Sequence, residues 1–237
     1  QAFYKKTPKT QAREKLGLDQ ESTYVLLMCG SMGCGPIEKT AKDLVEKLPE
    51  NAKVIAVCGS NTTLFESMEK IQNSRLTALG FTSNIDEYMD AVDLMITKPG
   101  GLSSTEGANK GLPMVFFNLI GACESRNFNY FLSKDYALGS SAEAEVVDLA
   151  VELAKDAQRR ENMSLALQKN FCTNSTEEII SHVTAQIEKQ WQKTIAAMLY
   201  VKEVIFMPDY YEWDEMPDYE YDEAAFRTAE EEVLQRH

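Results

Sequence analysis

Histidine is scarce in this sequence, and neither copy is well placed for proton transfer. His182 lies in a late helical stretch and His237 is the last residue. No Ser-His-Asp set is visible, and the spacing of Cys, His, Asp and Glu matches no metal site. No catalytic residue, metal ligand or cofactor is therefore predicted within this chain.

Other absences narrow the class of protein. Five cysteines form no CxxC pair, which indicates reduced thiols in a cytosolic protein rather than a disulfide framework. No apolar run approaches the ~20 residues of a membrane span, and the N-terminal residues lack the apolar core of a signal peptide. With 44% apolar residues, the chain has the composition of a globular protein that buries a core.

Positive charge is also in short supply. The net charge is −13, and residues 201–237 carry 12 acidic and 3 basic side chains, which place −9 in that segment. This balance argues against binding to nucleic acid, and against binding of this chain alone to an anionic membrane. The segment repeats Met-Pro-Asp-Tyr without helical or strand periodicity, so it is predicted to be a solvated or partner-binding tail.

Short, continuous apolar runs alternate with amphipathic stretches in the first 200 residues. Continuous rather than alternating apolarity indicates strands covered on both faces. Repeated strand–helix units predict an α/β fold, a Rossmann-like doubly wound parallel sheet with helices on both faces. The strands are expected at 24–30, 53–59, 75–81, 93–98, 113–118 and 136–139, and the helices at 38–48, 63–71, 85–92, 104–111, 143–156, 158–170 and 176–200.

Ligands of such sheets bind beyond the carboxyl ends of the strands, where this sequence concentrates glycine. The richest of these segments is "TKPGGLSSTE" at 97–106. Gly100 and Gly101 can take positive φ, and backbone N–H groups are expected to point outward at a helix start, where a diphosphate is favoured. The hydroxyls of Ser103, Ser104 and Thr105 are expected to donate to the same ligand. The alternative is a tight turn followed by a capped helix.

Glu106 has two interpretations. Ser103 and Glu106 have the spacing of a capping box, in which Glu106 bonds a backbone N–H. Its carboxylate could instead accept two hydrogen bonds from a ribose diol. The spacing favours the cap without deciding the matter.

Two further loops carry candidates of the same kind. "CGSMGCGPIEKT" fails both the dinucleotide fingerprint and the P-loop because Glu38 replaces a glycine, which leaves Gly33 and Gly35 in a tight turn or beside a ligand. "NLIGACESRN" clusters Glu124 and Asn127 at a ligand-facing end, where Ser125 or Asn127 could equally cap a helix.

With these loops in place, residues 10–190 resemble the C-terminal half of GT-B glycosyltransferases. "LLMCGSMGCGPIEKT", "VIAVCGSN" and "ITKPGGLSSTEGANKGLP" are similar, in order and spacing, to monogalactosyldiacylglycerol synthases and processive diacylglycerol glucosyltransferases of family 28. The resemblance implies residues 1–20 leading in from an interdomain linker and a UDP-sugar-binding domain at 21–200. It also implies a missing N-terminal domain that binds the lipid acceptor and supplies the base. The acidic tail at 201–237 has no counterpart in the resemblance and follows from composition alone.

Carried over position by position, the resemblance assigns Glu106 to the ribose hydroxyls. It places the loop at 100–105 at the diphosphate and the backbone of Phe81 at the uracil ring. Gly33 and Gly35 fall near the phosphates, and Glu124 and Asn127 near the donor sugar. Cys123 replaces an amide that is common in relatives, so the donor sugar is left open.

The leading hypothesis is the donor-binding part of an inverting hexosyltransferase that acts on a diacylglycerol-like lipid. The location implied is cytoplasmic, with peripheral contact to a membrane in the full-length protein. The alternatives are a non-catalytic nucleotide-binding or interaction module and one half of a sugar-nucleotide epimerase.

Overall fold

The computed structural model describes residues 2–30, 33, 35–117, 122–171 and 175–205. They form two compact units, Gln1–Thr173 and Asn174–His237. The first unit therefore ends before the predicted boundary at residue 200. Most of the predicted acidic tail lies outside the described residues.

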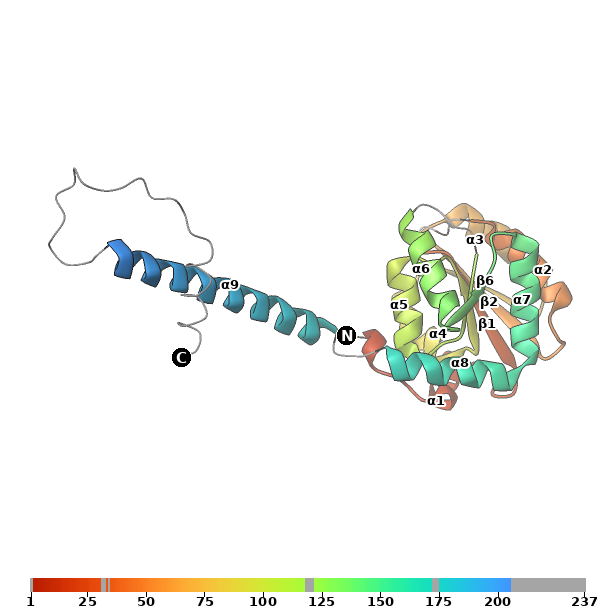
Figure 1. Cartoon of the computed structure of the whole chain (residues 1–237). Helices are drawn as coiled ribbons and strands as arrows, with labels where there is room; N and C mark the ends of the chain where they lie inside the picture. Colours follow the sequence, from red (N-terminus) through yellow and green to blue (C-terminus); the bar gives the residue numbers. More distant parts are fainter. Residues whose placement is uncertain (1, 31–32, 34, 118–121, 172–174, 206–237) are drawn as a thin grey trace. The chain divides into compact units, whose positions relative to one another are not determined.

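The first unit is built on a six-stranded, wholly parallel sheet, which confirms the predicted α/β fold (Figure 1). The strand order is β3-β2-β1-β4-β5-β6. The chain moves outward from β1 to β3, returns to the other side of β1 at β4, and continues to β6, so the order reverses between β1 and β4. The strands are β1 Thr23–Met28, β2 Ala52–Gly59, β3 Leu76–Gly80, β4 Leu94–Thr97, β5 Met114–Phe116 and β6 Ala137–Gly139.

Helices cover both faces of this sheet (Figure 1). Helices α2, α3 and α7 pack on one face, where Val25, Leu27 and Ile96 point. Helices α4, α5 and α6 pack on the other, against Leu26 and Met95. The helices of the first unit are η1 Ala2–Tyr4, α1 Lys9–Leu16, α2 Ile37–Lys47, α3 Thr62–Glu69, α4 Ile85–Ala91, α5 Gly101–Lys110, α6 Ala122–Ser133, α7 Glu143–Lys155 and α8 Ala157–Asn170.

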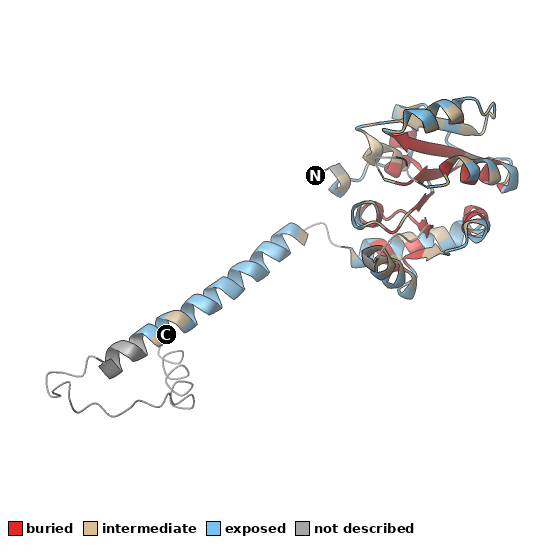
Figure 2. Ribbon diagram, turned by 90° about the horizontal axis from the view of Figure 1, so that it is seen from above, coloured by how far each residue is buried: buried red, intermediate tan, exposed pale blue. Residues whose placement is uncertain are grey.

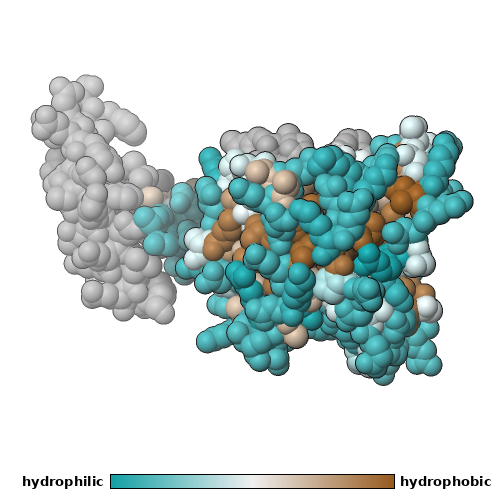
Figure 3. Space-filling view, turned by 90° about the vertical axis from the view of Figure 1, so that its right-hand side faces the viewer, coloured by the Kyte–Doolittle hydropathy of each residue, from teal (hydrophilic) through white to brown (hydrophobic). Residues whose placement is uncertain are grey.

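Burial explains why the strands read as continuous apolar runs. In β1 and β2, consecutive residues are buried because each lies under one or the other helical layer (Figure 2). The face of the molecule in Figure 3 is largely hydrophilic, and hydrophobic residues show between the hydrophilic ones across its middle. The predicted linker segment is part of this unit: α1 packs on α4, and Arg13 is buried with its Nε donating to the Ala91 carbonyl at 2.8 Å.

The second unit contains α9, Ser175–Ile205, which is exposed along most of its described length (Figure 2). The predicted helix at 176–200 is confirmed and extends further. Its exposed apolar side chains recur at helical spacing and include Ile180, Val183, Ile187 and Trp191. Among the described residues, none of the helices has the length and apolarity required to cross a membrane.

Candidate functional site

The candidate site lies at the carboxyl ends of β1 and β4, where the strand order reverses. The two strands are directly paired, with Val25 opposite Leu94 and Leu27 opposite Ile96. The loops that leave them therefore start side by side, at Cys29 and Lys98. Most of the predicted site residues belong to these loops and to the helices that follow them.

Helix α5 begins directly beyond β4. Its N-cap is Gly100, and the first intrahelical bond runs from the Ser104 N–H to the Gly100 carbonyl at 3.0 Å. The N–H groups of residues 101–103 have no carbonyl one turn earlier to bond, so they face outward at the positive end of the helix dipole. This supplies the backbone donors that the sequence predicted.

The positive φ that glycine permits is not used at this turn. Gly100 is extended, with φ −71° and ψ 143°, and Gly101 is already helical. A Cβ at Gly100 would meet only ordinary contacts, 3.6 Å from the Lys98 Cε, and one at Gly101 would lie 4.0 Å from the Asn127 Nδ2. Neither backbone strain nor packing requires these glycines, and their small size leaves space in front of the helix.

The hydroxyl groups of α5 differ in their availability. Ser104 is buried and donates to the Gly100 carbonyl at 2.6 Å, and Thr105 donates to the Gly101 and Leu102 carbonyls. These two side chains therefore satisfy carbonyls of their own helix rather than pointing donors at a ligand. Ser103 makes no such bond to the described part of the chain, and it lies in the first turn.

The structure rules out the capping-box interpretation of Glu106. Because α5 starts at Gly101, Ser103 and Glu106 both lie inside the helix, and the N-cap makes no side-chain hydrogen bond. Glu106 is half-buried, and its carboxylate has no hydrogen-bond or ion-pair partner among the described residues. Burial raises the pKa of the Glu106 carboxyl above its usual range. A desolvated carboxylate without a partner is suited to accept hydrogen bonds from a ligand.

A side chain that sequence reasoning missed, Lys98, joins this site to α6. The Lys98 Nζ forms an ion pair with the Glu124 Oε1 at 2.8 Å, and the Asn127 Nδ2 donates to the Pro99 carbonyl at 2.9 Å. Lys98 also reaches the first loop, since its Cε lies 3.8 Å from the Cβ position of Gly30. Its place immediately before Pro-Gly-Gly at a strand end was the available signal.

Helix α6 also corrects an alternative drawn from the sequence. It spans Ala122–Ser133, so Ser125 and Asn127 lie within it and do not cap it. Residues 118–121, which precede it, lie outside the described residues. Glu124 and Asn127, predicted from a cluster of polar residues, contact the loop at 98–100.

The first glycine-rich loop is shaped by contact with the protein itself. Gly33 and Gly35 have positive φ, 56° and 99°. A Cβ at Gly33 would come within 2.1 Å of the Cys58 carbonyl oxygen at the end of β2, so this close approach demands glycine. Gly33 therefore packs against the end of the neighbouring strand, which favours the tight-turn interpretation at this position.

The remaining candidates lie at the same end of the sheet. Phe81 follows β3 directly and is 74% exposed, so its side chain is accessible at this end of the sheet. Glu38, which broke both phosphate-binding fingerprints, forms an ion pair with Lys42 at 2.6 Å and accepts a bond from Ser67. The described residues contain no cluster of His, Cys, Asp and Glu that could hold a metal ion.

Comparison with known proteins decides the family. The glycosyltransferase family 28 C-terminal domain matches residues 24–183. The chain belongs to this family. The stretch that matches begins within β1 and includes every predicted site residue, from Gly33 in the first loop to Asn127 in α6.

Relatives of the family 28 domain include two lipid glycosyltransferases. A processive diacylglycerol β-glucosyltransferase of Bacillus licheniformis is 30% identical over 78% of this chain and 49% of its own length. A probable chloroplastic monogalactosyldiacylglycerol synthase of Nicotiana tabacum is 30% identical over 61% of this chain and 28% of its own length. The chain thus spans about half the length of the Bacillus relative and a smaller share of the Nicotiana relative.

Solved structures share the fold. MurG of Acinetobacter baumannii superposes with a TM-score of 0.63 at 17% identity, over 77% of this chain and 55% of MurG. Alr3699/HepE of Anabaena, solved in complex with UDP, gives a TM-score of 0.59 at 19% identity, over 78% of this chain and 54% of that protein. In both superpositions the matched region is about half of the solved protein, as expected for one Rossmann-like half of a GT-B architecture.

Proposed function

We propose that the family 28 domain binds a UDP-sugar and forms the donor half of an inverting glycosyltransferase. The transferred group is a hexose, and the acceptor is a lipid similar to diacylglycerol. The 30% identity to a processive diacylglycerol β-glucosyltransferase supports this substrate class. The fold shared with HepE, which was solved with UDP, agrees with the proposed nucleotide.

The observation that carries the proposal is the environment of Glu106. It lies on α5 beyond the outward-facing N–H groups of residues 101–103, so a ligand that lies along the helix start would meet both. A nucleoside diphosphate fits this order of groups: the diphosphate accepts from the N–H groups and the ribose diol donates to Glu106. Binding would give the half-buried carboxylate the partners that it lacks within the described protein.

In the proposed reaction, a base from the missing N-terminal domain removes the proton of the acceptor hydroxyl. The acceptor oxygen then bonds to the anomeric carbon as the bond to UDP breaks, which inverts the configuration. Negative charge grows on the leaving diphosphate, where the α5 N-terminus stabilises it without a metal. This chain alone is therefore expected to bind UDP and to transfer no sugar.

Calorimetric titration of the full chain with UDP, UDP-glucose, UDP-galactose and UDP-N-acetylglucosamine tests the proposal. Glu106→Gln is expected to weaken UDP binding about 10–100-fold because it removes charge-assisted bonds to the ribose. Glu152→Gln removes the same charge from an exposed position of α7 and should leave the affinity unchanged. Absence of UDP binding to the wild-type chain at millimolar concentration would contradict the proposed function.

The stability of Glu106→Gln separates binding from a structural role. Because burial raises the pKa of Glu106, the ionised carboxylate disfavours folding once the pH exceeds the pKa of the unfolded chain. The variant should therefore be as stable as the wild type at neutral pH, or more stable by up to about 0.5 kcal/mol, since the group is half exposed. Below the unfolded-state pKa this gain should vanish. A loss of stability at neutral pH would indicate that Glu106 supports the helix instead.

A further inference from the structure

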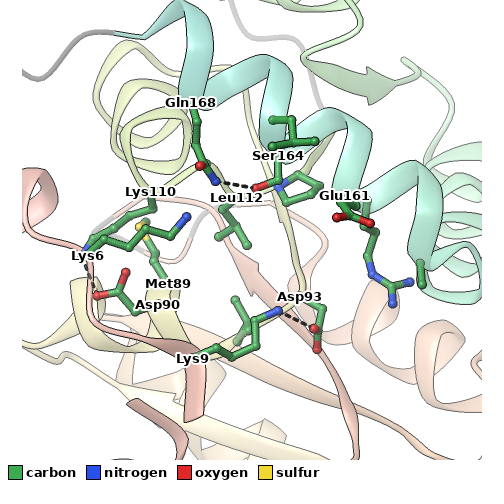
Figure 4. A pocket seen from close by; sticks show the side chains of 16 residues that line it. Lys6, Lys9, Met89, Asp90, Asp93, Lys110, Leu112, Glu161, Ser164 and Gln168 are labelled. Atoms are coloured by element: carbon green, nitrogen blue, oxygen red, sulfur yellow. Dashed lines mark hydrogen bonds and ion pairs between the residues drawn. The ribbon is translucent and has the colours of Figure 1, made fainter. Parts of the chain in front are cut away.

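A pocket lies at the opposite end of the sheet from the candidate donor site. It has a volume of about 400 Å³ and is framed by the residues that precede β4 and β5, by α8 and by the N-terminal segment (Figure 4). This volume lies in the range of small-molecule pockets, about 300–1,000 Å³. No residue of the candidate donor site lines it.

Most charges in this pocket are already paired. Asp93 accepts from the Lys9 Nζ and from Arg13, each at 2.7 Å, and Asp90 forms a buried ion pair with the Lys110 Nζ at 2.7 Å. Lys6 is different. Its ammonium makes no hydrogen bond or ion pair with the described residues, and in Figure 4 the side chain is directed into the pocket.

The surroundings of Lys6 disfavour its positive charge. Burial of the ammonium lowers its pKa, and the nearby charges of Lys9 and Lys110 lower it further, while Asp90 opposes them. Although Lys6 is exposed along much of its length, its charged end is thus partly removed from water. An anion in the pocket would offset this desolvation.

Asp90 adds a second unmet requirement. Its side chain is only 2% exposed, and its Oδ2 accepts from the Thr7 N–H at 3.1 Å as well as from Lys110. Its Oδ1 is buried and has no partner among the described residues. A buried acceptor of this kind needs a donor from a ligand or from water. A ligand that offers an oxyanion to Lys6 and a hydrogen-bond donor to Asp90 would therefore satisfy both groups.

We propose that this pocket binds a phosphate monoester, whose unprotonated phosphate oxygens accept from Lys6 and whose remaining P–OH group donates to the Asp90 Oδ1. Met89, Val92 and Leu112 provide an apolar wall for the carbon skeleton. On the far side, the Ser164 Oγ accepts from the Gln168 amide at 2.9 Å, which leaves the Ser164 hydroxyl free to donate to a phosphate oxygen. The site is separate from UDP binding.

The test uses the full chain with glycerol 3-phosphate, inorganic phosphate and glycerol as calorimetric probes. Glycerol 3-phosphate is expected to bind saturably and more tightly than inorganic phosphate, and glycerol not to bind. Lys6→Met should weaken phosphate binding at least about tenfold, as expected for loss of one charge-assisted contact. Lys5→Met is the matched control, because it removes the same charge from a side chain that does not line the pocket. UDP titration of Lys6→Met should match the wild type.

A vesicle experiment distinguishes the two sources of a phosphate monoester. Vesicles of phosphatidylcholine with phosphatidic acid that retain the wild type, but not Lys6→Met, identify a lipid headgroup as the ligand. Binding of soluble glycerol 3-phosphate without vesicle retention identifies a free metabolite. Absence of saturable binding by any phosphate probe, or equal binding by Lys6→Met and the wild type, would overturn the proposal whether or not UDP binds.

Discussion

The two ends of the sheet use charged side chains in different ways. At the amino ends of β4 and β5, Asp90 and Asp93 are engaged by Lys110, Lys9 and Arg13, which tie the N-terminal segment to the core. At the carboxyl ends, the first backbone N–H groups of α5 and the half-buried Glu106 carboxylate have no such partners among the described residues. One end uses ionic groups chiefly to hold the fold, and the other leaves polar groups for a ligand.

The same contrast appears in single titrating groups. Burial raises the pKa of Glu106 at one end and lowers that of Lys6 at the other. Both shifts have desolvation as the first cause, and both groups lack a partner among the described residues. An unpaired, desolvated charge lowers the stability of the fold unless a ligand binds to it. Each of the two groups is therefore a candidate ligand contact.

The largest expected loss of stability concerns the buried ion pair between Lys110 and Asp90 at the amino end. Lys110→Met should lower the free energy of unfolding by about 3–5 kcal/mol, because it leaves the buried Asp90 carboxylate without its ion pair. Urea denaturation measures the loss. Lys47→Met also removes a lysine paired at 2.7 Å, with Asp148, but both side chains are exposed and the loss should be below about 1 kcal/mol. Equal losses in the two variants would show that the buried pair does not hold this end together.

Gly33 at the carboxyl end should give the next largest loss of stability, and Gly100 is the comparison. Gly33→Ala should destabilise the fold by about 2–4 kcal/mol, because φ is +56° and the new Cβ would meet the Cys58 carbonyl at 2.1 Å. Gly100→Ala has neither problem and should stay within about 1 kcal/mol of the wild type. Its methyl group, close to Lys98 and Glu124, should instead weaken UDP binding. Thermal melts and UDP titrations of both variants would contradict this contrast if Gly100→Ala proved the less stable.

The fold was predictable because its signals are local. Runs such as residues 24–30 and 53–59 are apolar at every position because β1 and β2 are covered on both faces. The loops of the site followed from the general rule that ligands meet the carboxyl ends of parallel strands. Gly100, Glu106 and Asn127 were singled out in this way, and their contact with a ligand stays a prediction.

The missed features depend on distant parts of the chain. Ser103 and Glu106 have capping-box spacing, but α5 begins at Gly101, and spacing alone does not reveal where a helix starts. The Lys98–Glu124 pair joins two loops that only the sheet brings together. The pocket at the amino ends of the strands collects side chains from the N-terminal segment, α4, α5 and α8, so no single stretch of sequence predicts it.

Lys98→Met should have the smallest of these effects and the most specific one. The Glu124 carboxylate fixes the Lys98 ammonium beside the start of α5, where further N–H donors can reach a diphosphate. UDP affinity should fall about tenfold, close to 1.4 kcal/mol, while the affinity for uridine, which lacks the diphosphate, should not change. Lys47→Met controls for the loss of one positive charge. Equal losses for UDP and uridine would mean that Lys98 supports the shape of the loop, and the carboxyl end would then also use its ion pair to hold the fold.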